Sequence, residues 1–135
     1  MARILDYPAV KQINSRQWQL LEDLEYHIGS EDGPLITVPS GYETDFASVP
    51  KALWSVFPPF GRYSPAAVIH DYLYGSQGAP LTIYEQYANI ENGKHSAMRK
   101  LCDKIFLEAM EVMEVNWITR HTMYRAVRMF GFINY

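Results

Sequence analysis

The feature that most constrains the fold is a change in hydrophobic period along the chain. From Trp18 to Ile28, apolar side chains occupy every even position except position 22. A period of two over this length predicts one half-buried β-strand. Residues 29–34, GSEDGP, predict a turn, and Leu35–Val38 predicts a second strand that pairs with the first in a hairpin or meander. A weaker strand is expected at Arg3–Leu5.

Beyond residue 63 the apolar positions follow the period of an α-helix. The first helix is predicted to have Ser64 as its N-cap, Pro65 at its first position and Gly75 as its stop. Helical spacing then recurs from about Ser96 to Val115 and from about Trp117 to Phe130. The chain is therefore predicted to be α+β, with a small antiparallel N-terminal sheet, a long packed loop and three helices.

The length of the chain predicts one domain. At 135 residues, with 48% hydrophobic and 20% charged residues, it has the balance of a globular protein and too few residues for two good cores. The β part is predicted at about 1–40, the loop at 41–63 and the helical part at 64–135. The loop contains proline and aromatic residues, so we expect it to be packed down, with a short helical turn at 51–56.

Charge and hydropathy restrict the possible partners. The net charge of −3 makes nucleic acid an unexpected partner, and no apolar run is long enough to span a membrane. The N-terminus does not have the pattern of a signal peptide, so we expect synthesis in the cytoplasm. The single cysteine, Cys102, lies in an apolar helical stripe, which favours a buried structural thiol over a nucleophile.

The first predicted helix carries the candidate site. His70 shares a face with apolar residues three and four positions away, so it is expected to point inward, with Asp71 on the flank. A buried histidine and aspartate need partners, such as a metal ion, an arginine or backbone amides. Asp103, at the edge of the next apolar helical stripe, and Asp45, in the loop, provide further carboxylates.

Three interpretations of this cluster stay open. His70, Asp45 and Asp103 are residue types that bind a zinc, manganese or similar divalent ion, which would activate water for hydrolysis. Alternatively, His70 bonds to Asp45 as a structural clamp, with Arg62 as the counter-charge of another aspartate. Ser48, His70 and an aspartate also match the residue types of a catalytic triad, a combination that is common by chance.

The last predicted helix has a cationic face. No acidic residue occurs from Val115 to Tyr135, and His121, Arg125 and Arg128 share one side of the helix. This pattern is typical of a nucleic-acid or partner-binding surface. It is also typical of cations near a helix C-terminus that pair with glutamates of the preceding helix. We favour the second interpretation, because the rest of the chain is acidic.

Four blocks resemble a known family: GYETDFASVP (41–50), PPFGRYSPAAVIHDYLYG (58–75), DKIFLEAM (103–110) and MYRAVRMFG (123–131). In this order they resemble a phage and prophage family catalogued as domain of unknown function 1353, from about Trp18 onward. The resemblance implies a phage or prophage origin. Its recurrent polar residues fall on Thr44, Asp45, Ser48, Arg62, His70, Asp71, Tyr72, Tyr74 and Asp103. The link from Gly75 to Ser96 is longer than the family pattern, which suits a partner-binding or lid segment.

Two classes of function follow from these residues and this resemblance. The first is a small hydrolase, metal-assisted through one divalent ion, that acts in lysis or on the cell envelope. It would use His70 with two of Asp45, Asp71 and Asp103 as ligands or acid–base groups. The second is a non-catalytic virion component, tail- or capsid-associated, that contacts other virion proteins or a copy of itself. In that class the polar cluster is scaffolding.

Overall fold

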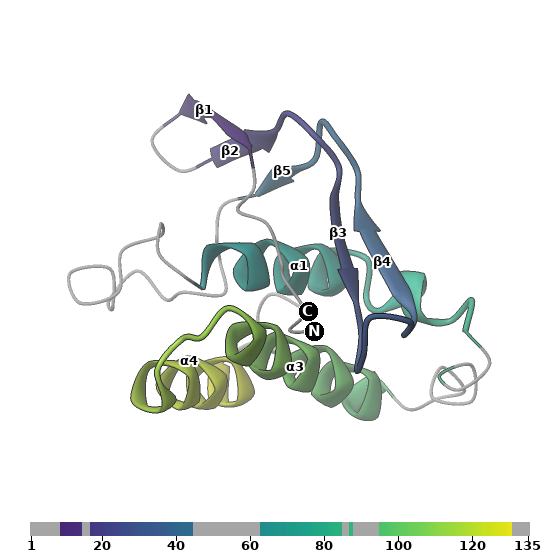
Figure 1. Cartoon of the computed structure of the whole chain (residues 1–135), viewed down its shortest axis with the longest axis vertical. Helices are drawn as coiled ribbons and strands as arrows, with labels where there is room; N and C mark the ends of the chain where they lie inside the picture. The colour runs from purple at the N-terminus through teal and green to yellow at the C-terminus, as the bar shows by residue number, and fades with distance from the viewer. Residues whose placement is uncertain (1–8, 15–16, 45–62, 85–86, 88–94, 131–135) are drawn as a thin grey trace.

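The computed structural model describes residues 9–14, 17–44, 63–84, 87 and 95–130. The strands are β1 (Val10–Asn14), β2 (Gln17–Leu20), β3 (Leu24–His27), β4 (Leu35–Val38) and β5 (Glu43–Thr44). The helices are α1 (Ser64–Gly75), the short 3-10 helix η2 (Ala79–Leu81), α3 (His95–Val112) and α4 (Trp117–Phe130). Antiparallel N-terminal strands followed by three α-helices confirm the predicted α+β class (Figure 1).

The prediction of a single strand from Trp18 to Ile28 was wrong. The segment forms two strands in different sheets, because β2 lies between β1 and β5 whereas β3 pairs with β4. Three residues, Leu21–Asp23, separate the two strands, and the Leu21 amide still bonds to Ala9. Because three residues lie between the strands, the buried side chains of β2 and of β3 both fall on even-numbered positions.

The turn at residues 29–34 and the following strand are confirmed, since β3 and β4 form an antiparallel hairpin with Tyr26 opposite Ile36. β1 was not predicted, because four of its five residues are exposed and the segment lacks an alternating apolar pattern. β5, within the predicted loop, has only two residues. The strand expected at Arg3–Leu5 and the helical turn at 51–56 lie outside the described residues.

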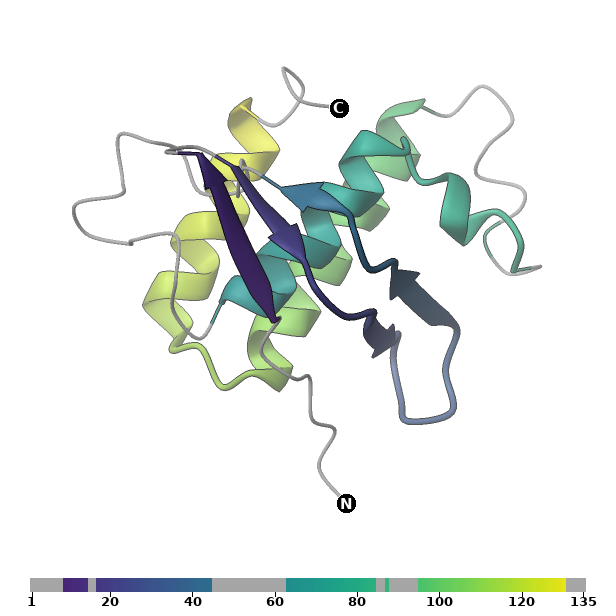
Figure 2. The ribbon, with the colours of Figure 1, turned by 90° about the horizontal axis from the view of Figure 1, so that it is seen from above.

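Helix α1 lies at the centre of the molecule. In Figure 1 it runs between the strands and α3, and Figures 1 and 2 show α4 to one side, next to α3. Contacts of α1 with β3, β4 and β5 on one side and with α3 on the other agree with this layering. All residues from Ser64 to His70 are buried, which is typical of a helix enclosed on every side.

The helix ends differ in detail from the prediction. Tyr63 is the N-cap of α1 and makes no side-chain cap bond, so Ser64 is the first helical residue and not the cap. The chain leaves α1 through Gly78, which has φ of 78° and whose amide donates to Leu73. α3 ends three residues before the predicted Val115, because Glu114 takes up a left-handed conformation (φ 60°) that closes the helix.

The core contains the single cysteine, as predicted. Cys102 is fully buried in a cluster that includes Leu20, Ile69 and Phe106, and burial raises the pKa of its thiol to about 12. Such a thiol is protonated at neutral pH and is a poor nucleophile. No helix among the described residues is long and apolar enough to cross a lipid bilayer.

Candidate functional site

A buried histidine–aspartate pair joins α1 to α3. The Nε2 atom of His70 lies 2.7 Å from Oδ1 of Asp103, and the two residues are 1% and 0% exposed. His70 projects from the buried face of α1, as its spacing predicted, and its ring stacks on Phe106 at a centroid distance of 4.6 Å. Both groups are therefore held in place by packing as well as by the hydrogen bond between them.

Three further side chains surround the carboxylate of Asp103. The Tyr74 hydroxyl, one turn after His70 on α1, donates to Oδ1. On the other oxygen, Oδ2, the Arg128 guanidinium donates at 2.7 Å from α4, and Arg99 lies 3.6 Å away on α3 itself. Donors from all three α-helices thus converge on this one buried carboxylate.

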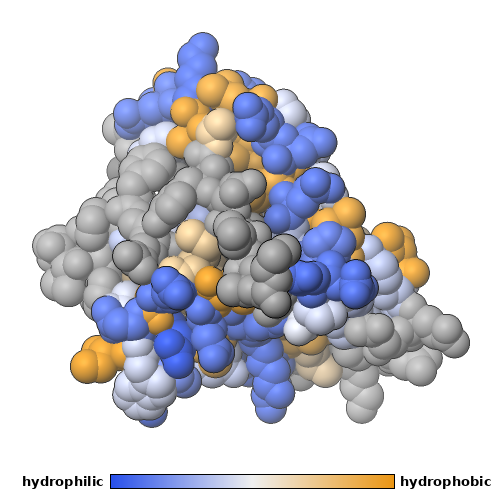
Figure 3. Space-filling model, in the orientation of Figure 1, coloured by the Kyte–Doolittle hydropathy of each residue, from blue (hydrophilic) through white to orange (hydrophobic). Residues whose placement is uncertain are grey.

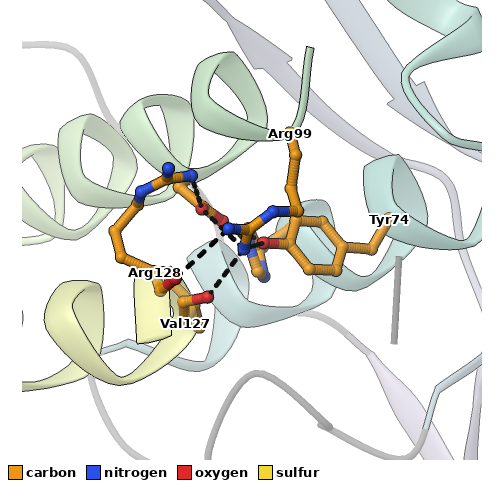
Figure 4. Close-up of polar contacts among 6 residues, drawn as sticks. Tyr74, Arg99, Val127 and Arg128 are labelled. Atoms are coloured by element: carbon orange, nitrogen blue, oxygen red, sulfur yellow. Dashed lines mark hydrogen bonds and ion pairs between the residues drawn. The ribbon is translucent and has the colours of Figure 1, made fainter. Parts of the chain in front are cut away.

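Arg99 links this cluster to the end of α4. Its Nη1 atom contacts the Tyr74 hydroxyl at 3.3 Å and the Val127 carbonyl at 3.1 Å, and Nη2 contacts the Arg128 carbonyl at 3.2 Å. Figure 4 shows the Arg99 guanidinium between Tyr74 and the last turn of α4. The two carbonyls belong to the last four residues of the helix, where the helix itself provides no amide partner.

The electrostatics of the pair favour a neutral imidazole beside an ionised carboxylate. Burial lowers the pKa of His70 by more than the hydrogen bond and the charge of Asp103 raise it, and the charge of Arg99 lowers it further. Burial raises the pKa of Asp103, but hydrogen bonds from His70, Tyr74 and Arg128 outweigh it and the pKa is lowered. An ionised carboxylate can only accept, so Nε2 of His70 carries the proton that it donates.

Asp71, next to His70 along the chain, belongs to a separate group. Its Oδ2 accepts from Thr44 Oγ1 at 2.6 Å and from the Tyr42 hydroxyl at 3.2 Å. Tyr42 also packs edge-on against Tyr72, with ring centroids 5.3 Å apart. Adjacent helical residues diverge by about 100°, so His70 faces α3 while Asp71 faces the β5 end of the sheet.

Within the described parts of the chain, the predicted site residues form two separate clusters. His70, Tyr74 and Asp103 form one cluster, while Asp71, Thr44 and Tyr72 lie around a second one. Asp45, Ser48 and Arg62 lie outside the described residues. The clamp between His70 and Asp45, the metal set and the triad with Ser48 therefore stay predictions.

The predicted metal set fits the described residues only in part. No group of three or more histidine, cysteine, aspartate or glutamate residues suited to a metal occurs within the described parts of the chain. Asp103 also has four donors around its two oxygens, which leaves it poorly placed to bind an ion directly. In metal sites, a carboxylate often accepts from the second ring nitrogen of a ligating histidine. Asp103 fits that orienting role better than the role of ligand.

Sequence analysis did not identify Arg99, Arg128 or Tyr42 as members of these clusters. Arg99 precedes Asp103 by four residues on one helix, a spacing typical of an ion pair, so this contact could have been found. Arg128 was assigned to the cationic face of the last helix. Its contact with Asp103 joins residues 25 positions apart on different helices, which no local spacing reveals.

The arrangement resembles the base half of a catalytic triad. A buried carboxylate that accepts from one nitrogen of a neutral histidine fixes the tautomer and orients the ring. With the proton on Nε2, the lone pair of the imidazole lies on the other nitrogen, Nδ1. The same five residues also tie three helices together, so the cluster has the chemistry for either a structural or a catalytic role.

Comparison with known proteins supports the family assignment. No curated protein and no solved structure gives a significant match to the chain. Residues 18–127 match the model of a family described as protein of unknown function (DUF1353). The match includes β2 to β5, α1 and α3, together with every residue of both polar clusters except Arg128. This chain therefore belongs to the DUF1353 family.

Proposed function

We propose that this protein is a phage-encoded hydrolase of the bacterial cell envelope, in which His70 is the general base. In this proposal Asp103 orients His70 through Nε2, and Nδ1 takes a proton from the water that attacks the scissile bond. Arg99, Arg128 and Tyr74 keep the Asp103 carboxylate ionised and in place. Release of the proton from Nδ1 to the leaving group completes the cycle and returns the imidazole to its neutral form.

The observation that carries this proposal is the 2.7 Å contact between His70 Nε2 and a fully buried Asp103 carboxylate. Five side chains of three helices are ordered around this contact, and the pKa of His70 is lowered while that of Asp103 is also lowered. A neutral imidazole that is oriented by an ionised carboxylate is in the state that a general base requires. The phage origin comes from the family resemblance, and the cell envelope is proposed as the substrate because it is a natural target of a phage hydrolase.

The cleanest test is hydrolysis by matched variants. Wild type, His70→Asn, Asp103→Asn and the control His27→Asn would be assayed on a chromogenic carboxylic ester, purified peptidoglycan and phospholipid vesicles. His27 is exposed on β3, away from the cluster. We expect the first two variants to lose about two to four orders of magnitude in rate and the control to keep wild-type activity. Equal rates for all four proteins would overturn the proposal.

In an alternative form of this proposal, His70 and Asp45 bind a divalent ion, and the ion would activate the water in place of His70. Elemental analysis of the purified protein, wild type beside His70→Ala, tests it directly. Near-stoichiometric metal that disappears in the variant would assign His70 as a ligand, with Asp103 behind it as the orienting carboxylate. Equal metal content in the two proteins would remove the ion from the proposal and leave His70 as a base for free water.

One observation favours a second function, that of a non-catalytic virion component. His70 is only 1% exposed and Asp103 is fully buried, so the pair has little contact with solvent. A buried ion network that ties three helices is also a way of specifying one packing arrangement. This alternative predicts that the protein occurs in purified phage particles at a fixed copy number, measured by quantitative mass spectrometry. It also predicts that the hydrolysis assays above give no activity in any variant.

A further inference from the structure

Helix α4 keeps one continuous side exposed to solvent. Positions 118, 122, 125 and 129 are all exposed, and their spacings of three and four residues place them on one side of the helix. Trp117, at the start of the helix, is exposed beside them. We call Trp117, Ile118, Thr122, Arg125 and Met129 the α4 face. It runs the length of the helix, about 21 Å.

The α4 face is rich in large apolar side chains. Trp117, Ile118 and Met129 are 61%, 70% and 64% exposed, and they make up half of the large exposed hydrophobic residues in the described parts of the chain. Figure 3 shows hydrophobic atoms projecting at the lower left, where Figure 1 draws α4. Single exposed apolar residues are ordinary on proteins. Ile118 and Met129 on one strip, with an exposed Trp117 about 100° around the helix from Ile118, are a sign of a binding surface.

The charge of α4 is opposite to that of the molecule as a whole. From Trp117 to Phe130 the helix contains Arg120, His121, Arg125 and Arg128 and no acidic residue, although the net charge of the chain is −3. Arg128 is paired with the buried Asp103, so Arg125 is the exposed arginine of the α4 face. Glu111 and Glu114, both exposed, mark the boundary of this cationic region at the α3 end. A molecule with such separated charge would turn α4 toward an anionic surface and its acidic remainder away.

We propose that the α4 face binds the surface of an anionic lipid bilayer. The helix would lie in the plane of the interface, with Trp117, Ile118 and Met129 among the headgroups and Arg125 against lipid phosphates. Exposed tryptophan and aliphatic side chains beside arginine are the composition of helices that bind in this way. The proposal does not rest on the hydrolase, although an enzyme of the envelope would gain access to its substrate through such a face.

Nucleic acid and protein partners fit the α4 face less well. Ile118 and Met129 have no group that recognises a base or a phosphate, and Trp117 is already packed on His121 at 4.5 Å between ring centroids. A stable protein interface takes about 800 Å² from each partner, whereas the α4 face is a strip one helix wide. A bilayer surface makes no such demand on shape, because lipids adapt to the side chains that enter them.

Vesicle flotation of the full chain tests this proposal. We expect the protein to float with vesicles of equal parts phosphatidylcholine and phosphatidylglycerol, less so as salt is raised, and not with phosphatidylcholine alone. The double variant Trp117→Ser, Ile118→Ser should bind at least about tenfold more weakly. Ile83→Ser is the matched control, since Ile83 is 77% exposed but lies outside α4, and it should bind as wild type does.

A second variant keeps the test decisive if the double variant unfolds. Arg125→Gln removes one exposed cation and should weaken both the binding to anionic vesicles and its salt dependence. Absence of binding to anionic vesicles would overturn the proposal, as would binding that neither variant weakens. Tight binding of a single-stranded oligonucleotide to the wild type, with loss of that binding in the same variants, would also overturn it. The α4 face would then be a nucleic-acid surface.

Discussion

At the scale of single residues, the Asp103 carboxylate is the group that most polar side chains of the buried cluster contact. His70, Tyr74 and Arg128 donate to it directly in a site that excludes solvent. Removing one member of a buried ion pair leaves the others uncompensated and costs about 3–5 kcal/mol. We expect Asp103→Asn, which keeps the shape but removes the charge, to lower the free energy of unfolding by that amount. Urea denaturation measures it.

The control for this prediction is Asp32→Asn. Asp32 is exposed in the turn between β3 and β4, so its loss should change the free energy of unfolding by no more than about 0.5 kcal/mol. If the Asp103 variant were as stable as this control, the charge on Asp103 would not contribute to folding. The donors around it would then be satisfied equally well by a neutral amide.

Also at the residue scale, His70 should make the protein less stable in mild acid. Its pKa lies below the ordinary value of 6.5, mainly because of burial, so the folded state resists a proton that the unfolded state accepts. As the pH falls below 6.5, the free energy of unfolding should decrease by up to about 1.4 kcal/mol per pH unit until the folded pKa is reached. Urea denaturation across this pH range measures the slope.

The matched variants for this slope are His70→Gln and His27→Gln. The first removes the buried imidazole. The free energy of unfolding of this variant should therefore change less with pH than that of the wild type, even if the variant is less stable at every pH. The second removes an imidazole that is exposed on β3, away from the buried cluster, and is the control. A wild-type slope in His70→Gln would mean that the pKa of His70 is the same in the folded and the unfolded protein, so that burial does not hold the imidazole neutral.

At the scale of the elements, the exit from α1 depends on Gly78. Its φ of 78° disfavours any side chain, and an added Cβ would lie 2.5 Å from Cγ and Sδ of Met98 on α3. We expect Gly78→Ala to cost about 2–4 kcal/mol, from backbone strain and from overpacking. Gly29→Ala is the control, since Gly29 has φ of 81° but nothing within 4 Å of the added Cβ.

The comparison of these two variants separates strain from overpacking. Gly29→Ala should cost only the strain, about 1–2 kcal/mol. In a Met98→Ala background, Gly78→Ala should cost less than it does in the wild type, because the added methyl group then has room. Equal costs for the two glycine variants by thermal denaturation would show that Met98 moves away freely.

The elements themselves could be predicted from the sequence where one face of each is buried. α3 and α4 were located by their apolar stripes, and the β3–β4 hairpin by its alternation and turn. β1 could not be predicted, because its side chains are largely exposed. The division of Trp18–Ile28 into two strands was also hidden, since the three residues between them preserve the alternation of buried positions.

In the candidate site too, the features that depend on one element could be predicted and the contacts between elements could not. The inward orientation of His70 followed from helical spacing within one element, and burial confirms it. The choice of Asp103 as its direct partner depends on how α1 packs against α3, and the contribution of Arg128 depends on where α4 ends. Such contacts between helices are determined by tertiary packing, so local patterns could only supply a list of candidate residues.

At the scale of the whole molecule, access to the core should depend on cooperative unfolding. α1 is enclosed between the strands and α3, and Cys102 of α3 is fully buried in the cluster that α1 and the strands also form. Its thiol has a pKa raised to about 12, so it is neither exposed nor ionised while the protein is folded. We expect a disulfide reagent to label this only cysteine at the rate at which the protein opens.

This expectation connects the Asp103 cluster to the global stability. Under conditions where reclosing is faster than labelling, the rate follows the equilibrium population of the open state. A loss of about 3–5 kcal/mol in Asp103→Asn should therefore speed the labelling of Cys102 by about a hundredfold or more. Asp32→Asn should leave the rate unchanged. Rapid labelling of the wild type in the absence of denaturant would instead mean that α3 opens locally, and that the buried ion network does not hold the three helices together.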